Sequence, residues 1–495
     1  MKRVLFLLSA LVLLASCAEK PVVLTVEGGQ IQGVKADIPG VTVFRGIPYA
    51  AAPIGDLRWK EPQPVEPWEG VKVCDKFGHP GYQSVHYPGG YTTEWGYGDE
   101  APYSEDCLYL NVWTKAPGQV DKKLPVALWI HGGGYREGWG SEPEFDGQEW
   151  ANKDVVLVSI NYRLGVFGFL CHPELSAESP HGVSGNYGIL DQIQSLKWIK
   201  ENIAQFGGDP DNVMIFGQSA GAGSVRTLCE SPLTVSLFNK AVIMSGGGLN
   251  KNPQAPTIGR GAMTLETAEK QSKEVLDWAG LTNLQKMRAA STETLYALST
   301  IKNMVDAPAV PDGMPAMFRF FGAGITGMPI VDGYVSLRSF DEAAVGDNLP
   351  HIPYMIGYTM DDMGDMCEGI RDFCLNREAV GDKAYAYEFA RPLPDDGSQK
   401  NVLEGAFHSS DLWFVFKSLK HCWRPWTQGD WDLSEKMLTA WSNFAKTGEP
   451  GIGWNPCTQE APEFMIFKLD ENDAEASAPS ATTIPTSRPP FVWGK

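Results

Sequence analysis

Five short apolar runs, separated by helical and loop segments, are the feature that most limits how this chain can fold. Continuous apolar runs of this length are typical of strands buried on both faces of a parallel sheet. Between the second and third run, apolar residues recur at steps of three and four from Ile189 to Phe206, which predicts a helix. We therefore expect an α/β fold with a mostly parallel central sheet. The runs span residues 126–130, 155–160, 213–216, 241–244 and 354–356.

The remaining segments are expected to add to this sheet rather than to form further domains. Short β runs at residues 22–26 and 42–44, in a stretch rich in Pro, Gly and Val, predict N-terminal antiparallel strands. Residues 255–330 and 365–440 predict helical insertions. We expect a single domain over residues 22–470 and a polar, proline-rich tail over residues 471–495.

The first residues have the pattern of an export signal. Lys2 and Arg3 precede an apolar stretch that is long enough for a signal peptide and too short to span a bilayer. The small residues Ala15 and Ser16 stand directly before Cys17, which resembles the lipoprotein box of bacteria. The prediction is a signal peptide over residues 1–16, a lipid anchor at Cys17 on a short tether over 17–21, and a place in the bacterial cell envelope, facing the periplasm or the surface. The alternative is an ordinary secretory signal that contains a cysteine.

The charge of the chain limits its partners. Sixty Asp and Glu stand against 41 Lys and Arg, a formal net charge of −19. Because phosphates are repelled by such a surface, nucleic acid and anionic lipid headgroups are excluded as main partners. No later segment reaches the roughly 18 consecutive apolar residues of a membrane-spanning helix. We expect a small-molecule substrate, and membrane contact through Cys17 alone.

Nine cysteines occur, and their spacing does not match that of zinc sites. We therefore expect no metal ion. Cys171 and Cys229 lie in apolar surroundings, which favours free buried thiols. Pairing of Cys367 with Cys374, or of Cys422 with Cys457, stays open.

Gly217-Gln218-Ser219-Ala220-Gly221 matches the G-x-S-x-G motif, directly after a predicted strand and before a small-residue run that suits a helix. This is the strand–turn–helix context of a nucleophile elbow, which places a serine hydroxyl at the positive end of a helix. We expect Ser219 to be the nucleophile; the alternative is a structural turn.

A second glycine-rich segment, His131 to Gly134, follows an upstream strand. Successive glycines let backbone N–H groups approach a substrate oxygen closely, as an oxyanion hole requires. The N–H of Ala220, just after the nucleophile, is a further expected donor. The alternative is a plain turn, of the kind that Ser245 to Gly248 also indicates.

A nucleophilic serine needs a histidine base and an orienting acid, which follow in the order Ser, acid, His in this kind of fold. Three histidines follow Ser219, and we favour His408 over His351 and His421 because an apolar run anchors its loop. The acid is expected after the strand at 354–356. Spacing alone leaves three acids open at this point, Asp361, Asp362 and Asp365.

The pattern as a whole resembles the type-B carboxylesterase family, over nearly all of residues 22–470. The blocks that carry the resemblance are Phe44 to Ala50, Ser104 to Val112, Asn161 to Arg163, Gly185-Asn186, Leu190 to Gln192, Pro329 to Gly333 and Trp441 to Gly448. The resemblance implies an α/β-hydrolase fold and a cofactor-free carboxylic-ester hydrolase. It also implies particular roles for residues of this chain.

By this resemblance the acid is Asp362, the base is His408, and the oxyanion donors are Gly133, Gly134 and Ala220. Ser245 matches a serine that supports the acid. Cys74 and Cys107 match the family's disulfide beside the active-site gorge. Arg45 with Glu105, and Arg163 with Asp191, match buried structural ion pairs.

Two departures from the family pattern affect the expected substrate. The residue before the nucleophile is Gln218 where the family often has Glu, and the acid is Asp362 rather than Glu. Loss of a carboxylate beside His408 weakens attraction for cationic esters, so we expect a Ser-His-Asp hydrolase of small or aryl esters. The alternatives are a lipase or feruloyl-type esterase, and a non-catalytic adhesion or binding module on the same scaffold.

Overall fold

Eleven of the described strands form one sheet, in the order β14-β13-β12-β11-β10-β9-β7-β8-β6-β4-β3. The computed structural model describes residues 22–83, 89–97, 102–250, 263–305, 325, 327–469 and 480–483. The predicted signal peptide and tether lie outside these residues, as does the predicted tail except for residues 480–483. The strands cover the following ranges: β1 Val23–Val26, β2 Gly29–Gln32, β3 Val34–Lys35, β4 Thr42–Pro48, β5 Val71–Val73, β6 Tyr109–Thr114, β7 Leu124–Ile130, β8 Val156–Ile160, β9 Gly208–Gln218, β10 Lys240–Met244, β11 Tyr354–Thr359, β12 Ala384–Phe389, β13 Glu463–Phe467 and β14 Ser480–Thr483.

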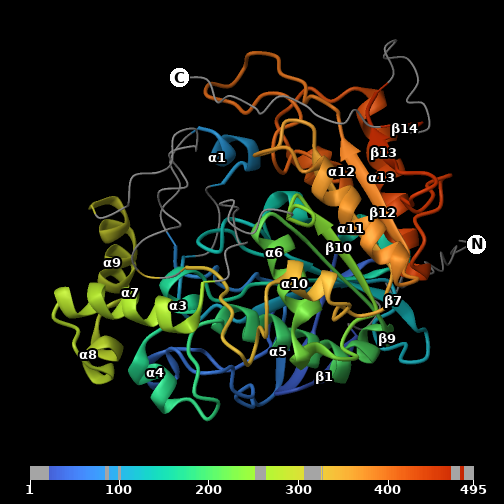
Figure 1. Ribbon diagram of the computed structural model, residues 1–495. Helices are drawn as coiled ribbons and strands as arrows, with labels where there is room; N and C mark the ends of the chain where they lie inside the picture. Colours follow the sequence, from blue (N-terminus) through green and yellow to red (C-terminus); the bar gives the residue numbers. More distant parts are fainter. Residues whose placement is uncertain are drawn as a thin grey trace, which may run out of the picture.

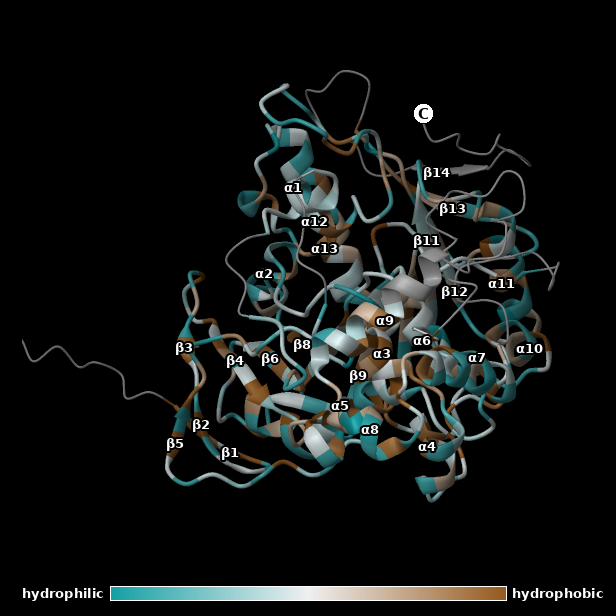
Figure 2. Cartoon of the chain, turned by 90° about the vertical axis from the view of Figure 1, so that its left-hand side faces the viewer, coloured by the Kyte–Doolittle hydropathy of each residue, from teal (hydrophilic) through white to brown (hydrophobic). Residues whose placement is uncertain are grey.

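The central strands, from β8 to β13, run parallel, whereas the N-terminal strands β3, β4 and β6 and the edge strand β14 pair antiparallel. Each of the five apolar runs forms a parallel strand, because side chains of a continuous apolar run are buried on both faces of the sheet. A separate small sheet, β1-β2-β5, lies at one edge of the molecule (Figure 2). The predicted α/β fold with added antiparallel strands is confirmed.

The helices lie against the sheet and in the insertions between strands (Figure 1). The predicted helix from Ile189 to Phe206 is α5, which ends in a 3-10 turn over Ile203–Phe206. The helices cover the following ranges: α1 Tyr91–Trp95, α2 Gln148–Asn152, α3 Gly165–Phe169, α4 Pro173–Glu178, α5 Tyr187–Asn202, α6 Ala220–Glu230, α7 Leu265–Trp278, α8 Leu284–Ala289, α9 Thr292–Val305, α10 Phe340–Val345, α11 Cys367–Ala379, α12 Leu412–Val415 and α13 Gln428–Thr447.

The segment 365–440 was expected to be helical, and this was wrong for β12, which lies within it. Its sequence, Ala-Tyr-Ala-Tyr-Glu-Phe, is not a continuous apolar run. Glu388 is nonetheless buried there, because its carboxylate accepts a hydrogen bond of 2.7 Å from the hydroxyl of Tyr358 on β11. A cross-strand partner therefore makes a charged residue compatible with a central strand.

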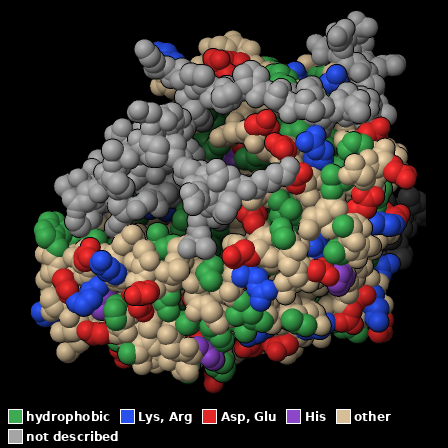
Figure 3. All heavy atoms as spheres, in the orientation of Figure 1, with side chains coloured by type: hydrophobic (Ala, Val, Ile, Leu, Met, Phe, Trp, Pro, Cys, Tyr) green, Lys and Arg blue, Asp and Glu red, His purple; other side chains and the backbone are tan. Residues whose placement is uncertain are grey.

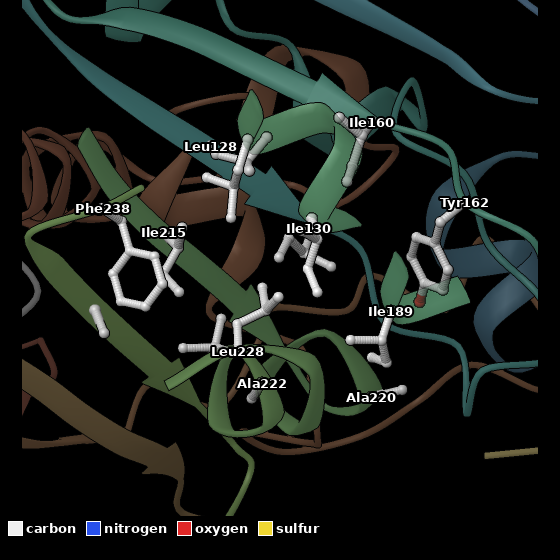
Figure 4. Packing of buried hydrophobic residues seen from close by; sticks show 14 of the residues in the cluster. Leu128, Ile130, Ile160, Tyr162, Ile189, Ile215, Ala220, Ala222, Leu228 and Phe238 are labelled. Atoms are coloured by element: carbon white, nitrogen blue, oxygen red, sulfur yellow. The ribbon is translucent and has the colours of Figure 1, made fainter. Parts of the chain in front are cut away.

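The sheet separates two apolar layers, and alternate residues of its central strands enter opposite layers. In β7, Leu128 and Ile130 belong to the layer that includes α5 and α6, whereas Ala127 and Trp129 belong to the layer that includes α12 and α13. This alternation follows from the period of two of a β-strand. Figure 4 shows Ala220, Ala222 and Leu228 of α6 packed over Leu128 and Ile130 of β7 and Ile215 of β9.

One of the two expected buried ion pairs is present. Arg163, in the loop after β8, donates to both carboxylate oxygens of Asp191 on α5, at 2.8 and 2.7 Å. The other pair was wrong. Glu105 instead binds Arg58 in a bidentate contact of 2.7 and 2.5 Å, while Arg45 donates to the backbone carbonyl of Asp75. Arg58 directly follows a short 3-10 turn, which brings its guanidinium to Glu105.

The expected disulfide between Cys74 and Cys107 is a further correction, because both are free thiols. The two sulfur atoms have different surroundings. Cys74 follows β5 and its thiol faces the carbonyl of Lys72 at 3.8 Å. The thiol of Cys107 is buried near the Arg163–Asp191 pair, and burial raises its pKa. The other described cysteines are also free, with Cys374 and Cys457 hydrogen-bonded to one another.

The visible face of the molecule shows how acidic and basic side chains are arranged there. On the face seen in Figure 3, Asp and Glu side chains are interspersed with Lys and Arg rather than gathered in one patch. Among the described residues, no helix is both long and apolar enough to cross a membrane.

We predict that Asp191→Ala lowers the free energy of unfolding by about 3–5 kcal/mol, because it leaves the buried charge of Arg163 without a partner. The matched control is Asp277→Ala, which breaks the exposed pair with Lys273 on α7 and is expected to cost at most about 0.5 kcal/mol. Urea unfolding followed by tryptophan fluorescence measures both. Equal losses in the two variants would contradict the structural role of Asp191.

Candidate active site

Ser219 lies at a sharp turn between β9 and α6. Its backbone has φ 57° and ψ −120°, which a residue with a side chain adopts only under strain of about 1–3 kcal/mol. The turn is held on both sides, since the N–H of Ser219 donates to Met244 and its carbonyl accepts from Gly223, both at 2.9 Å. A side chain at Gly221 would come within 2.0 Å of the carbonyl oxygen of Ile130. The predicted strand–turn–helix is therefore present, and α6 begins at the serine.

The glycine segment after β7 lies against this turn. A β-carbon at Gly132 would come within 3.2 Å of the β-carbon of Ser219. Gly133 has φ +87°, and a side chain there would meet the carbonyl of Glu137 at 2.1 Å. The carbonyl of Gly133 accepts hydrogen bonds of 3.0 Å from the N–H groups of Arg136 and Glu137, which closes a tight turn. The segment is therefore a constrained loop beside Ser219, with backbone rather than side chains facing the serine.

His131 supports the start of this loop and does not serve as the catalytic base. It is 1% exposed, and burial lowers its pKa to about 3, so the ring stays neutral. The ring stacks on Tyr162 with a centroid separation of 4.5 Å, and the hydroxyl of Tyr162 donates to the carbonyl of His131. The neutral, stacked ring holds the start of the glycine segment.

His408 and Asp362 lie together, in the loops after β12 and β11. Nδ1 of His408 donates to Oδ1 of Asp362 over 2.6 Å. Asp362 is 3% exposed, and it also accepts hydrogen bonds from the backbone N–H groups of Thr359 and Met363. Burial alone would raise the pKa of Asp362, but the facing His408 and these hydrogen bonds hold it below the usual range. Asp362 therefore remains a carboxylate that orients the imidazole.

The three acids that sequence spacing left open occupy three different environments. Asp361 joins the two loops, because its backbone N–H donates to Ala406 and its carboxylate accepts from the N–H of Ala406 at 2.8 Å. A side chain at Gly405 would meet this carboxylate at 2.4 Å. Asp365 accepts from the N–H of Cys367 at the start of α11. Only Asp362 reaches His408 among these three.

Gln218 contacts the other side of the imidazole. Its amide nitrogen lies 3.1 Å from Nε2 of His408, which accepts the hydrogen bond because Nδ1 carries the proton. Within the described residues no hydrogen bond joins Ser219 to His408. Such contacts often tighten only when substrate is bound. Ser245, at the end of β10, lies beside Asp362 and further lowers the pKa of that acid.

The other two histidines that follow Ser219 make contacts with acidic residues elsewhere. His351 is exposed and its Nδ1 lies 3.2 Å from Asp382. His421 pairs with Asp146 at 3.0 Å. The glycine turn from Ser245 to Gly248 also has a structural partner, since Arg226 donates to the carbonyls of Gly246, Gly247 and Gly248.

Two residues near His408 were missed by sequence reasoning. The hydroxyl of Tyr91, on α1, donates to the backbone carbonyl of His408 over 2.9 Å, across 317 residues of chain. Asp411 is fully buried and accepts from Tyr387 at 3.0 Å; burial raises its pKa to about 7. No local motif marks either residue, because each contact joins segments that are remote in sequence.

No group of three or more His, Cys, Asp or Glu side chains suited to a metal ion is found in the described part of the chain. The site itself offers a strained serine at a helix N-terminus, a carboxylate-oriented imidazole, and a loop of backbone N–H groups.

Comparisons with known proteins agree on one family. Residues 19–373 and 366–483 match the model of the carboxylesterase family. A fumonisin B1 esterase from Sphingopyxis macrogoltabida is 35% identical over 442 residues, which cover 87% of this chain and 72% of that protein. A para-nitrobenzyl esterase from Bacillus subtilis (strain 168) is 32% identical over 492 residues, covering 92% and 97%.

Solved structures agree with the sequence comparison. A PNB esterase aligns with a TM-score of 0.73 at 28% identity, covering 90% of this chain and 96% of that one. A carboxylesterase from Geobacillus stearothermophilus aligns with a TM-score of 0.71 at 30% identity, with the same coverage. These similarities extend over the strands, loops and helices that bring Ser219, Asp362 and His408 together.

We predict that Asp362→Asn lowers kcat for a para-nitrophenyl ester by about 10⁴-fold, because the neutral amide no longer orients the imidazole or stabilises its cation. Asp361→Asn is the matched control, since its amide oxygen can still accept from Ala406; we expect kcat to stay within about tenfold of wild type. Steady-state kinetics on the two variants measures the loss of kcat in each. A larger loss of kcat in Asp361→Asn than in Asp362→Asn would contradict the assignment of Asp362 as the acid.

Proposed function

From the premise that this chain belongs to the carboxylesterase family and is a serine carboxylesterase, we propose that Ser219, His408 and Asp362 carry its Ser-His-Asp mechanism. His408 takes the proton of Ser219 through Nε2, and the serine oxygen attacks the ester carbonyl. The N–H groups of Gly133, Gly134 and Ala220 stabilise the oxyanion. His408 then protonates the departing alcohol, and water releases the acyl group by the same route.

The observation that carries this proposal is the convergence of four loops at one end of the parallel sheet. The strained turn at Ser219 follows β9, and the glycine segment follows β7. The loops of Asp362 and His408, which pair with each other, follow β11 and β12. In a parallel sheet the carboxyl ends of the strands meet at one edge, so side chains that follow them can act on one bond. Gln218 must release Nε2 of His408 for the base to reach the serine.

The proposed substrates are small or aryl esters without a cationic group. An amide rather than a carboxylate stands at Gln218 beside His408, so this position lacks a negative charge that would attract a cationic alcohol. The names of two relatives agree with ester hydrolysis, since one is a para-nitrobenzyl esterase and another a fumonisin B1 esterase.

Ser219→Ala is expected to remove more than about 99% of the turnover of a short para-nitrophenyl ester, since loss of such a nucleophile costs about 10⁴-fold or more. The variant keeps the Tm of the wild type within a few degrees, because no buried contact of the hydroxyl is lost. A fluorophosphonate probe should add to wild-type Ser219 and to nothing in the variant, as read by mass spectrometry. Surviving turnover or labelling elsewhere would place the nucleophile at another residue.

The export and anchoring of the protein belong to the same proposal. Residues 1–16 have the charge and apolar pattern of a signal peptide, and small residues precede Cys17. We place the enzyme on the bacterial cell envelope through a lipid on Cys17, with the catalytic domain in water. Two or more acyl chains hold a protein stably at a membrane, whereas one is marginal.

Cys17→Ser is expected to move the enzyme from the membrane fraction to the soluble fraction of cells that express the full chain. Activity per molecule stays the same, because the anchor lies outside the catalytic domain. Cys74→Ser is the control, since that cysteine is a free buried thiol and its loss leaves any anchor intact. If wild type and both variants are found in the same fraction, the anchor is not at Cys17.

A further inference from the structure

Two buried glutamates, Glu142 and Glu144, lie directly behind the glycine segment. They flank Pro143 in a 3-10 turn over Pro143–Phe145, and they are 6% and 1% exposed. The mechanism proposed above uses neither residue. Burying a carboxylate without compensating partners is costly, so a pair of them behind the site requires a physical reason.

The two carboxyl groups differ in their partners. Glu142 accepts from the hydroxyl of Tyr97 over 2.5 Å at Oε2 and from the backbone N–H of Trp139 over 2.7 Å at Oε1. Among the described residues, no donor reaches either oxygen of Glu144. Its carboxyl group instead faces Glu142 at hydrogen-bond range. Two ionised carboxylates are both acceptors and repel one another, so this contact requires a proton between them.

The surroundings favour the protonated state. Glu94 faces Glu144 and Glu137 faces Glu142, so the nearby carboxyl groups add negative charge, whereas the neutral hydroxyl of Tyr97 donates to Glu142 and partly offsets this. Arg424, the cation nearest Glu94, is engaged with that residue in a fully buried pair of 2.6 Å, and Arg136 faces Glu137. His131, on the far side of Gly138, is neutral. Burial raises the pKa of Glu142 to about 7, and the pKa of Glu144 also lies well above its usual value.

The pair is connected to the glycine segment through consecutive backbone contacts. Glu142 accepts a hydrogen bond from the N–H of Trp139. The side chain of Gln83 accepts from the N–H of Gly138 at 2.9 Å and donates to its carbonyl at 3.2 Å. Gly140 donates to Asn161 over 2.8 Å. The residues just before them, Arg136 and Glu137, close the turn on Gly133. Movement of Glu142 would therefore be transmitted to Gly133.

We propose that Glu142 and Glu144 hold one proton between them and, in that form, act as positioning residues for the backbone N–H groups of Gly133 and Gly134. This inference rests on the proposed oxyanion role of those two residues. Loss of the proton places two like charges within hydrogen-bond range in an apolar site, and the segment from Trp139 to Glu142 moves to separate them. Oxyanion stabilisation then weakens.

The direction of the pH effect follows from the protonated form being favoured in the folded protein. For carboxyl groups whose pKa is raised on folding, the contribution to stability is fully present below the unfolded pKa of about 4.3 and is lost as pH rises through the folded value. Alkaline pH should therefore lower the Tm. It should also lower kcat more than it raises KM, because oxyanion contacts strengthen in the transition state.

The test uses Glu144→Gln, whose amide can supply an N–H donor to Glu142 without titrating. We expect this variant to keep kcat at pH 7 within about threefold of wild type, with a shallower fall of kcat and of Tm between pH 6 and pH 9. The control is Glu66→Gln, which removes an exposed charge and should follow the wild-type profile. Infrared spectra of the free enzyme should show a protonated carboxyl band that Glu144→Gln removes.

The proposal is overturned if Glu144→Gln shows the same pH profiles of kcat and Tm as the wild type, or if the variant keeps the infrared band. If Glu144→Gln does not fold, Glu142→Gln gives the same comparison, because its amide can donate to an ionised Glu144. The Tm profile and the infrared band need no substrate. They therefore separate this proposal from failure of the catalytic assignment, which fluorophosphonate labelling of Ser219 measures independently.

Discussion

The close approach of α6 to β7 and β9 is the constraint on which the rest of the site depends. No side chain fits at Gly221, because it would overlap the carbonyl of Ile130. This packing forces the chain to reverse at Ser219 with a strained backbone and places the serine at the helix N-terminus. The apolar contacts of α6 with the sheet, shown in Figure 4, supply the free energy that maintains the strain. The same packing brings the glycine segment after β7 against the serine.

Around this turn the protein places charges where water is excluded, and each is held by partners from distant segments. Asp362 stays ionised because His408 and backbone N–H groups face it. Glu94 on α1 is matched by Arg424, and α1 in turn holds the loop of His408 through Tyr91. Among the described residues no Lys or Arg forms a salt bridge with Glu142 or Glu144, and the proton that we propose between them takes that part. Burial makes each of these contacts strong and makes each missing partner costly.

Sequence reasoning was most successful where function or fold depends on contiguous residues. The apolar runs predicted the parallel strands, and G-x-S-x-G after one of them predicted the turn at Ser219. Sequence reasoning was wrong where a pairing depends on which of several similar residues makes the contact. Arg58 rather than Arg45 meets Glu105, and Cys74 does not reach Cys107. Matching such residues by a family pattern fails when their local alignment shifts, since a pairing depends on distance and not on residue type.

By itself, the sequence determined the layered α/β architecture, the nucleophile turn and the glycine segment, because these follow from local periodicity and from steric limits within a few residues. It also narrowed the acid to three neighbours, among which the family resemblance pointed to Asp362, and it favoured His408 among three histidines. Only the tertiary structure placed Asp362 against His408, gave Asp361 a structural contact with Ala406, and brought Glu142 and Glu144 together behind the oxyanion segment. Those outcomes depend on how remote loops meet at the end of the sheet. Burial and hydrogen bonding then decide the charge of each group, and no local pattern encodes either one.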